Sequence, residues 1–254
     1  MIDHGIKYHT FRVNLVPSVI SLANPPWQRE VWGRPSEFET LDEVVHVLFD
    51  DFCDACAPEK YLGVSLRTER EVELMRQVGV TYTAVQDEVG GLAPDEDFLA
   101  DPGWPEVVAA AGRLAPELVK NDMHALMSLR EAGHQWPPEV GAGRARVVPA
   151  VVLLACPTWQ REVWGASANL DELFDSPERF LGDSLRTGEE VELTRQLGVA
   201  YSAVRDAAYL DSDGWTEVVA AAGRLAQVMV TSDLQALAML DDSGHPWPPE
   251  VSGG

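Results

Sequence analysis

The chain has 254 residues, and 41 Asp and Glu against 19 Lys and Arg give a formal net charge of −22. Its hydrophobic fraction of 46% is too high for intrinsic disorder, and its negative charge argues against binding nucleic-acid phosphates or an anionic membrane surface. Three Cys make no disulfide framework, so we expect a cytoplasmic protein. The longest apolar run, residues 147–156, is about half as long as a membrane span.

An apolar stretch near the start of the chain, residues 13–23, follows Arg12 and has the look of a secretory leader. The same pattern returns as residues 144–155, deep inside the chain. A cleavable leader is not copied into the interior of a protein, so we interpret both stretches as structure. Both are rich in β-branched residues and carry a proline. We predict helices here, with a short strand as the alternative.

The chain contains much of its own sequence twice. Residues 27–33 are identical to residues 159–165, residues 66–87 match residues 185–206 at 15 of 22 positions, and residues 104–115 match residues 215–226 at 11 of 12. All eight Trp fall into four matched pairs. The offset between the copies shrinks from 132 to 119 and then to 111, so the second copy has lost residues at discrete places. A repeat of this length is the size of a domain and exceeds the periods of solenoids and propellers.

We therefore predict an all-α protein with two tandem homologous domains, each a helical bundle of about five helices with its own core. Residues 1–11 form an N-terminal extension, residues 12–140 the first domain, residues 141–143 a linker and residues 144–254 a shortened second domain. Each copy is acidic by itself, with 23 acidic and 10 basic residues in 12–140 and 17 against 8 in 144–251. Acidity therefore belongs to the repeated unit and not to a tail.

Two helix starts in the first copy carry capping signals. Asn24 followed by Pro25 predicts an N-cap and a first helical residue, for a short helix that Gly33 ends. Thr40 and Glu43 form a capping box, in which the hydroxyl and the carboxylate satisfy amides at the start of the next helix.

The clearest predicted helix starts at the capping pair Thr68 and Glu71 and ends at Gly90. Its apolar stripe consists of Val72, Met75, Val78, Tyr82, Val85 and Val89. A later helix should start at Asp101-Pro102, and Pro116 should kink or split it.

A Cys-x-x-Cys motif, Cys53 and Cys56, follows a predicted helix that carries His46 and Asp50. His46, Asp50 and Cys53 have the spacing of one helix face, so a partial metal site is one interpretation. A structural zinc site needs four ligands, and a redox role needs a strand-to-helix junction. Because the second copy lacks this stretch, we expect two ordinary thiols and no metal.

The sequence contains no His-Glu-x-x-His, no Gly-x-Ser-x-Gly and no glycine-rich phosphate loop. We therefore name no catalytic residue, expect no cofactor, and favour a protein that is not an enzyme.

Both copies end in Gly-His-x-Trp-Pro-Pro-Glu, which contains Trp136 in the first and Trp247 in the second. The Trp-Pro-Pro sequence favours polyproline II geometry. We expect each Trp to pack back on its own bundle. The alternative is a presented peptide-like ligand or a latch between the domains.

Arginines retained in both copies are the remaining candidates for a ligand or partner site. In a protein this acidic, we expect them to pair with Asp or Glu between helices. The alternative is a shared pocket for an anion or a partner. Together with the two terminal tryptophans, the candidates are Arg29, Arg67, Arg76, Arg113, Trp136, Arg161, Arg186, Arg195, Arg224 and Trp247.

The motifs follow one another in a recognisable order: Pro-x-x-Gln-x-Glu-x-Trp, an acidic helix, Leu-Gly with Leu-Arg, and Gly-Trp-Pro-Glu-Val-Val. They fall at residues 25–32, 41–50, 61–67 and 101–108, and again at residues 157–164, 170–174, 180–186 and 213–219. This order resembles an uncharacterised family of small acidic all-helical proteins from high-GC bacteria. The resemblance implies a helical fold but no activity, and the chain departs from the family pattern by duplicating the unit.

Two functions from different classes fit these observations. The preferred one is a non-enzymatic acidic interaction module, of an immunity or regulatory type, whose negative charge attracts a basic protein partner. We expect no nucleic acid and no membrane as partners, and expect the two repeats to pack as an intramolecular pseudo-dimer. The alternative is an enzyme or binder of a small anionic ligand, with its site in the cleft between the two repeats.

Overall fold

A computed structural model of the chain describes residues 2–32, 39–131, 141, 143–157, 170–204 and 214–242. Throughout these residues the regular structure is helical, and the only β-type pairings are two isolated bridges, Leu62 with Leu66 and Leu181 with Leu185. The all-α prediction is confirmed for this part of the chain. The two bridges occupy matching positions of the sequence repeat, just before α4 (Glu69–Val89) and α10 (Gly188–Val204).

The two apolar stretches that we interpreted as structure are both helices, α1 (His9–Leu22) and α7 (Arg144–Ala155). Each contains a proline, Pro17 and Pro149, at the matching position. Both helices are buried on several sides, and Leu15, Val16, Val19 and Ile20 have no exposed surface. This burial explains why the sequence is apolar all round instead of on one stripe.

The capping signals of the first copy are confirmed. Asn24 accepts a hydrogen bond from the Trp27 amide at the start of α2 (Pro25–Val31), and Thr40 and Glu43 form the expected capping box at the start of α3 (Leu41–His46). Helix α2 ends at Val31 with Trp32 as its C-cap, and Gly33 lies outside the described residues. Helix α3 continues into the π-helical turn η1 (Val47–Asp51).

Helix α4 follows the short 3-10 turn η2 (Pro58–Tyr61), and α10 follows η3 (Pro177–Phe180) in the same way. The Thr68 hydroxyl caps α4 by accepting from the Glu71 amide, and Val72, Met75, Val78, Tyr82 and Val85 are buried as the apolar stripe predicted. The second copy has a shorter helix before η3, α9 (Asp171–Asp175), where the first copy has α3 and η1.

The two longest of the described helices, α6 (Trp104–Glu131) and α11 (Trp215–Asp242), have the same length. Helix α6 follows the short α5 (Asp95–Ala100). The prediction that Pro116 splits this helix is wrong, because α6 runs through it without a break. A proline removes one hydrogen-bond donor, and packing of α6 against α1, α4 and α7 outweighs that loss.

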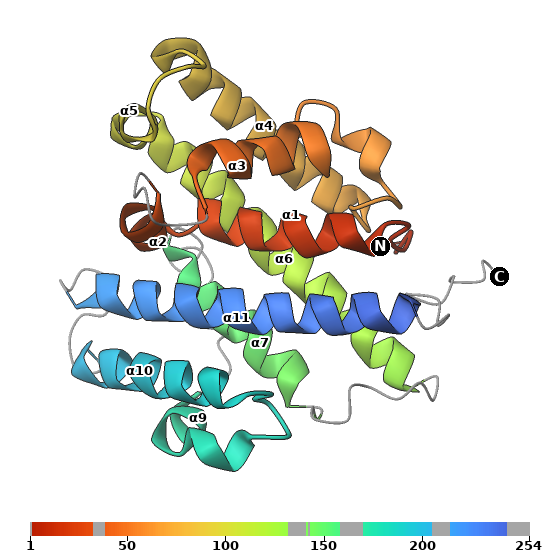
Figure 1. Cartoon of the computed structure of the whole chain (residues 1–254), viewed down its shortest axis with the longest axis vertical. Helices are drawn as coiled ribbons and strands as arrows, with labels where there is room; N and C mark the ends of the chain where they lie inside the picture. The colour runs from red at the N-terminus through yellow and green to blue at the C-terminus, as the bar shows by residue number, and fades with distance from the viewer. Residues whose placement is uncertain are drawn as a thin grey trace.

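Helices from the two copies pack on each other. Helix α1 packs against α6 and α11, while α7 packs against α11 and α6; α4 and α10 lie at opposite ends of the molecule, on α6 and α11 respectively (Figure 1). The buried hydrophobic residues of both copies belong to one cluster, so the expectation of a separate core for each copy is wrong. Helices α1 and α7 are apolar on more sides than one neighbour covers, and the other copy supplies the second neighbour.

Specific hydrogen bonds also join the copies. The Asn24 side chain, while capping α2, donates from Nδ2 to the carbonyl oxygens of Ala155 and Val219, both at 3.1 Å. A Cβ on Gly223 of α11 would lie 2.2 Å from this Nδ2, so only glycine allows the approach. Nearby, Gln227 of α11 donates to the Pro17 carbonyl at 3.0 Å and to the Ser21 hydroxyl at 2.7 Å.

Candidate functional site

Arg12, near the start of α1, is the centre of a buried group of charges. Its side chain has no exposed surface. Nε donates to Asp122 at 3.0 Å, and Nη1 and Nη2 donate to the two oxygens of Glu71 at 2.9 and 3.0 Å. The carbonyl oxygens of Ser65 and Leu118 accept from the remaining N–H groups at 2.9 and 3.1 Å. All five donors of the guanidinium are therefore satisfied.

Arg144, at the start of α7, has the same environment in the second copy. Nε donates to Asp233 at 3.0 Å, and Nη1 and Nη2 donate to Glu190 at 2.6 and 2.9 Å. The carbonyl oxygens of Ser184 and Met229 accept the other two bonds, each at 3.1 Å. Each partner stands at the position of the sequence repeat that matches its counterpart around Arg12.

Two of the predicted arginines, Arg67 and Arg186, complete these groups. Arg67 Nε donates to Asp122 at 2.8 Å, and Arg186 Nη2 donates to Asp233 at 2.7 Å. The backbone N–H of each arginine also donates to the glutamate of its own group, at 2.7 and 2.6 Å. We call Arg12, Arg67, Glu71 and Asp122 the first cluster, and Arg144, Arg186, Glu190 and Asp233 the second cluster.

Each cluster pairs two guanidinium groups with two carboxylates, so its net charge is zero. Burial disfavours the charged form of Arg12, but the adjacent carboxylates of Asp122 and Glu71 outweigh it and raise the pKa of Arg12. In the second cluster, burial is likewise outweighed by Asp233 and Glu190, and the pKa of Arg144 is raised. A closed and neutral cluster has no room for a substrate, and its chemistry is that of an interhelical tie.

A cavity of about 10 Å³ separates the two clusters where α6 approaches α11. Asp122 and Asp233, the aspartates of the two clusters, both line this cavity. Its other walls are Val119 and Met123 of α6, with their sequence counterparts Val230 and Leu234 of α11. Such a volume is close to that of one water molecule, so the cavity is too small to be a ligand pocket. It marks the place where the two clusters approach each other.

The predicted pair Arg76 and Arg195 lies on the surface. Arg76 forms ion pairs with Glu59 and Glu73, and Arg195 forms the matching pairs with Glu178 and Glu192. The hydrogen bond from Arg76 lowers the pKa of Glu59, and the bond from Arg195 lowers the pKa of Glu178. Both arginines therefore pair with the chain's own carboxylates. This agrees with the expected pairing to Asp or Glu and not with the alternative of a shared pocket for an anion or a partner.

The other predicted residues are scattered. Arg224 of α11 pairs with Glu30 of α2 at 3.1 Å and with Glu217 at 3.4 Å, so it too binds carboxylates and links the copies. Arg29 is exposed and Arg113 is half-buried. The remaining candidates, Trp136, Arg161 and Trp247, lie outside the described residues. The candidate arginines that the structure describes therefore do not gather in one pocket.

The alternative of a metal site at the Cys-x-x-Cys motif rested on one continuous helix face. His46 and Asp50 do meet, with Nδ1 3.0 Å from Oδ2. The π-helical turn η1 ends the helix at Asp51, so Cys53 leaves the face and enters the core, where burial raises its pKa to about 12. Cys56 is exposed. Among the described residues, no group of three or more His, Cys, Asp or Glu side chains is arranged so that it could hold a metal ion.

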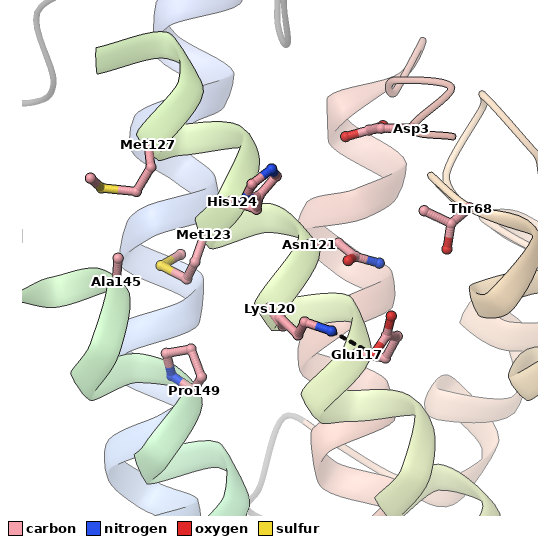
Figure 2. A pocket seen from close by; sticks show the side chains of 10 residues that line it. All are labelled: Asp3, Thr68, Glu117, Lys120, Asn121, Met123, His124, Met127, Ala145 and Pro149. Atoms are coloured by element: carbon pink, nitrogen blue, oxygen red, sulfur yellow. Dashed lines mark ion pairs between the residues drawn. The ribbon is translucent and has the colours of Figure 1, made fainter. Parts of the chain in front are cut away.

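A groove of about 500 Å³ lies between α6 and α7, and we call it the junction groove. One wall is apolar and consists of Met123, Met127, Ala145 and Pro149. The other side is polar, with Asp3, Thr68 and Asn121 beside the ion pair of Lys120 and Glu117 (Figure 2). Asn121 donates to Glu71 at 2.8 Å, and Asp3 pairs with Arg67 at 3.4 Å, so this groove lies directly over the first cluster.

Sequence reasoning missed the central members of both clusters. Arg12 and Arg144 were noticed only as the charged residues that precede apolar stretches, and Glu71 only as part of a capping signal. The usable signal was that both arginines, both glutamates and the aspartates Asp122 and Asp233 recur at matching positions inside apolar helices. A charge retained twice on a buried face requires a buried partner.

Comparison with known families gives one match. Residues 6–126 fit the model of a family described as "Domain of unknown function (DUF7945)". This matched segment includes α1 to most of α6, and the family is uncharacterised, in agreement with the resemblance noted above. Neither the curated proteins nor the solved structures provided a match. Within the described residues, no helix combines the length and the apolarity needed to cross a bilayer.

Proposed function

We propose that this chain is a non-enzymatic interaction protein that binds a basic protein partner through its acidic surface. The proposal is based on the ion pairs that the arginines of this chain form. Arg76, Arg195 and Arg224, like the four arginines of the clusters, pair with the chain's own carboxylates. Many of the remaining Asp and Glu side chains are exposed, so the surface presents a negative potential to an approaching partner.

The proposal includes the arrangement of the two repeats as an intramolecular pseudo-dimer. Three observations support it: the two clusters have the same bonding pattern, the family match covers a single repeat, and the small cavity is lined by residues and their own counterparts. Residues meet their counterparts at a twofold axis, so this cavity is where such an axis would pass. Two copies of one binding surface would then lie on a single chain.

Affinity purification with the full-length chain as bait tests the proposed function. We expect a stoichiometric partner of net positive charge that is released as the salt concentration rises, because screening weakens attraction between surface charges. A bait with Arg29→Glu, which adds negative charge at an exposed site, should retain it. The proposal fails if no stoichiometric partner is found, or if the partner is acidic and its binding is insensitive to salt.

The junction groove favours a second candidate function, a binder of a small ligand. It is lined by both repeats, since Ala145 and Pro149 belong to the second, and this is where the alternative placed its site. Of the duplicated arginines that the structure describes, none lines it, and its lysine is Lys120. A thermal-shift screen of anionic metabolites tests the idea, with Ala145→Trp as the variant that fills the groove. A concentration-dependent shift that Ala145→Trp abolishes would favour this candidate.

A further inference from the structure

A second groove, of about 610 Å³, lies where the start of α6 approaches the middle of α4. We call it the acidic groove. Its floor on α4 includes Val80, which is 65% exposed, and Ala84. Glu88, Asp101 and Glu106 stand around this floor, and none of the described Lys and Arg residues lines the groove. An exposed valine surrounded by carboxylates differs from the rest of α4, where the large apolar side chains face the core.

The shape of the acidic groove depends on a close approach at Gly103. A Cβ on Gly103 would lie 3.1 Å from Val85 Cγ2, so a larger residue would push the start of α6 away from α4. Asp101 accepts a hydrogen bond from the Gly103 amide at 2.7 Å, which occupies part of its carboxylate. Glu88 and Glu106 form no ion pair within the part of the chain that the structure describes, so their charge is available to a partner.

The second repeat presents the same exposed residues on α10. Val199, the counterpart of Val80, is 69% exposed, and Ala203, the counterpart of Ala84, is also exposed. The start of α11 approaches α10 in the same way, since a Cβ on Gly214 would lie 2.5 Å from Val204. The carboxylates of the groove are not repeated, because Ala207 stands at the sequence position of Glu88, and Glu217, the counterpart of Glu106, pairs with Arg224 at 3.4 Å. The second repeat therefore has the exposed valine without the free acidic residues, and it serves as a comparison within the same chain.

We propose that the acidic groove on α4 binds a lysine or arginine side chain from a basic segment of a partner protein. The aliphatic stem of such a side chain lies on Val80 and Ala84, and its charged end reaches Glu88 and Glu106. Only a long cationic side chain combines these two properties, because its stem is apolar and its end is charged. The inference rests on the proposed function and adds to it a contact surface that takes one basic segment per chain.

The test uses the full-length chain with methyl-labelled valine and alanine, observed by NMR. The probe is a short synthetic peptide of alternating lysine and alanine, added at low ionic strength. We expect saturable shifts of the Val80 and Ala84 methyl signals with a stoichiometry of one, and no such response from Val199 and Ala203, which lack the free carboxylates. The same peptide with glutamate in place of lysine should cause none, since like charges repel.

Three variants with the same change of charge locate the binding. Val80→Arg should weaken binding at α4 by at least about tenfold, because a like charge then occupies the groove. Val199→Arg makes the same change on α10, where the free carboxylates are missing, and should leave binding at α4 unchanged. Ile2→Arg, at a site that is 72% exposed and away from the groove, should also leave the response intact. Because all three positions are exposed, circular dichroism should show the same fold in each variant.

The outcomes separate the inference from the proposed function. If the peptide binds but shifts other methyl groups, or if Val80→Arg behaves like Val199→Arg and Ile2→Arg, the acidic groove is not the site, and the proposed function then depends on the rest of the acidic surface. If the peptide does not bind even at low ionic strength, the inference is overturned as well. The purification experiment then decides the proposed function by itself.

Discussion

Arg12 in the first repeat and Arg144 in the second donate to the same five groups, one aspartate, both oxygens of one glutamate and two backbone carbonyls. The junction groove beside the first cluster has no such duplicate. Its Lys120, His124 and Met127 on α6 correspond to Thr231, Gln235 and Ala238 on α11. The fold therefore needs the clusters in both repeats but does not need the residues of the groove, which are free to serve another purpose.

The two clusters also differ in how they are covered. Arg67 has no exposed side-chain surface, and Asp3 of the N-terminal segment pairs with it at 3.4 Å. Its counterpart Arg186 has 13% of its side chain exposed. The residues before α1 thus close the first cluster, and they have no counterpart in the repeat. Five measurements test how far the two repeats are equivalent, and they are given in decreasing order of the expected effect.

The first measurement removes the centre of a cluster. Arg12→Met should lower the free energy of unfolding by about 3–5 kcal/mol, because Glu71 and Asp122 are left as buried carboxylates that lose a main partner. Arg144→Met should have an effect of the same size. Chemical denaturation of the full-length chain measures both, with the exposed Arg29→Met as the control, expected within about 0.5 kcal/mol of the native chain. Unequal effects of the first two would refute the equivalence of the clusters.

The second measurement tests the contact between the repeats. Gly223→Ala should lower the free energy of unfolding by about 1–3 kcal/mol, because the new Cβ displaces Asn24 and breaks its bonds to Ala155 and Val219. Gly188→Ala is the control, since nothing lies within 4 Å of a Cβ there. The control should be neutral or slightly stabilising. An unchanged Gly223→Ala variant would show that Asn24 does not tie the repeats together.

The third measurement concerns the reactivity of the thiols, including Cys156, which stands at the position of Asn24 in the second repeat. Burial raises the pKa of Cys156 to about 12, and that of Cys53 as well, whereas Cys56 is exposed. At pH 8, iodoacetamide should label Cys56 alone in the native chain and all three thiols after denaturation, as mass spectrometry would show.

The same two thiols make the stability depend on pH. A pKa raised by folding means that the folded state keeps protons that the unfolded state loses, so stability falls as pH rises from about 9, the usual thiol value, towards 12. The double variant Cys53→Ala with Cys156→Ala should lose less stability over this range. If it follows the native chain from pH 9 to 11, the thiols do not contribute.

The smallest expected change in stability concerns Asp3, which pairs with Arg67 of the first cluster. Asp3→Asn should lower the free energy of unfolding by only about 0.2–1 kcal/mol, because Asp3 is partly exposed and its distance to Arg67 is long. Hydrogen exchange around the start of α4 should increase in this variant. An effect as large as that of Arg12→Met would mean that the N-terminal segment is an essential part of the cluster.

Much of the local structure was predictable because its causes are local. The stripe of α4 appears in the spacing of Val72 to Val85, and the starts of α2 and α3 appear in Asn24 and Thr40, since capping involves residues a few positions apart. The π-helical turn η1 and the continuity of α6 through Pro116 were not predictable, because packing against other helices decides both. Cys53 therefore lies in the core and not beside His46.

For the candidate site, the sequence showed which arginines are duplicated but not what they bind. Arg67 and Arg186 belong to closed clusters, while Arg76 and Arg195, duplicated equally well, lie on the surface with Glu59 and Glu178. The presence of an arginine in both copies does not tell a buried arginine from a surface one, because the repeat shows that the residue is retained and not where its side chain lies. Neither groove could have been predicted, since each is formed by residues of different helices.

The amino-acid sequence was enough to predict that the described chain is helical, where α2, α3 and α4 begin, that the chain is acidic and that one unit occurs twice. Helix periodicity, capping and charge act over a few residues, so they can be read along the chain. Tertiary structure alone decided that α1 and α7 share one core with α6 and α11, that four arginines are buried among carboxylates, and that valines stay exposed on α4 and α10. These features depend on which distant residues meet, and that choice is made by burial of the whole chain at once.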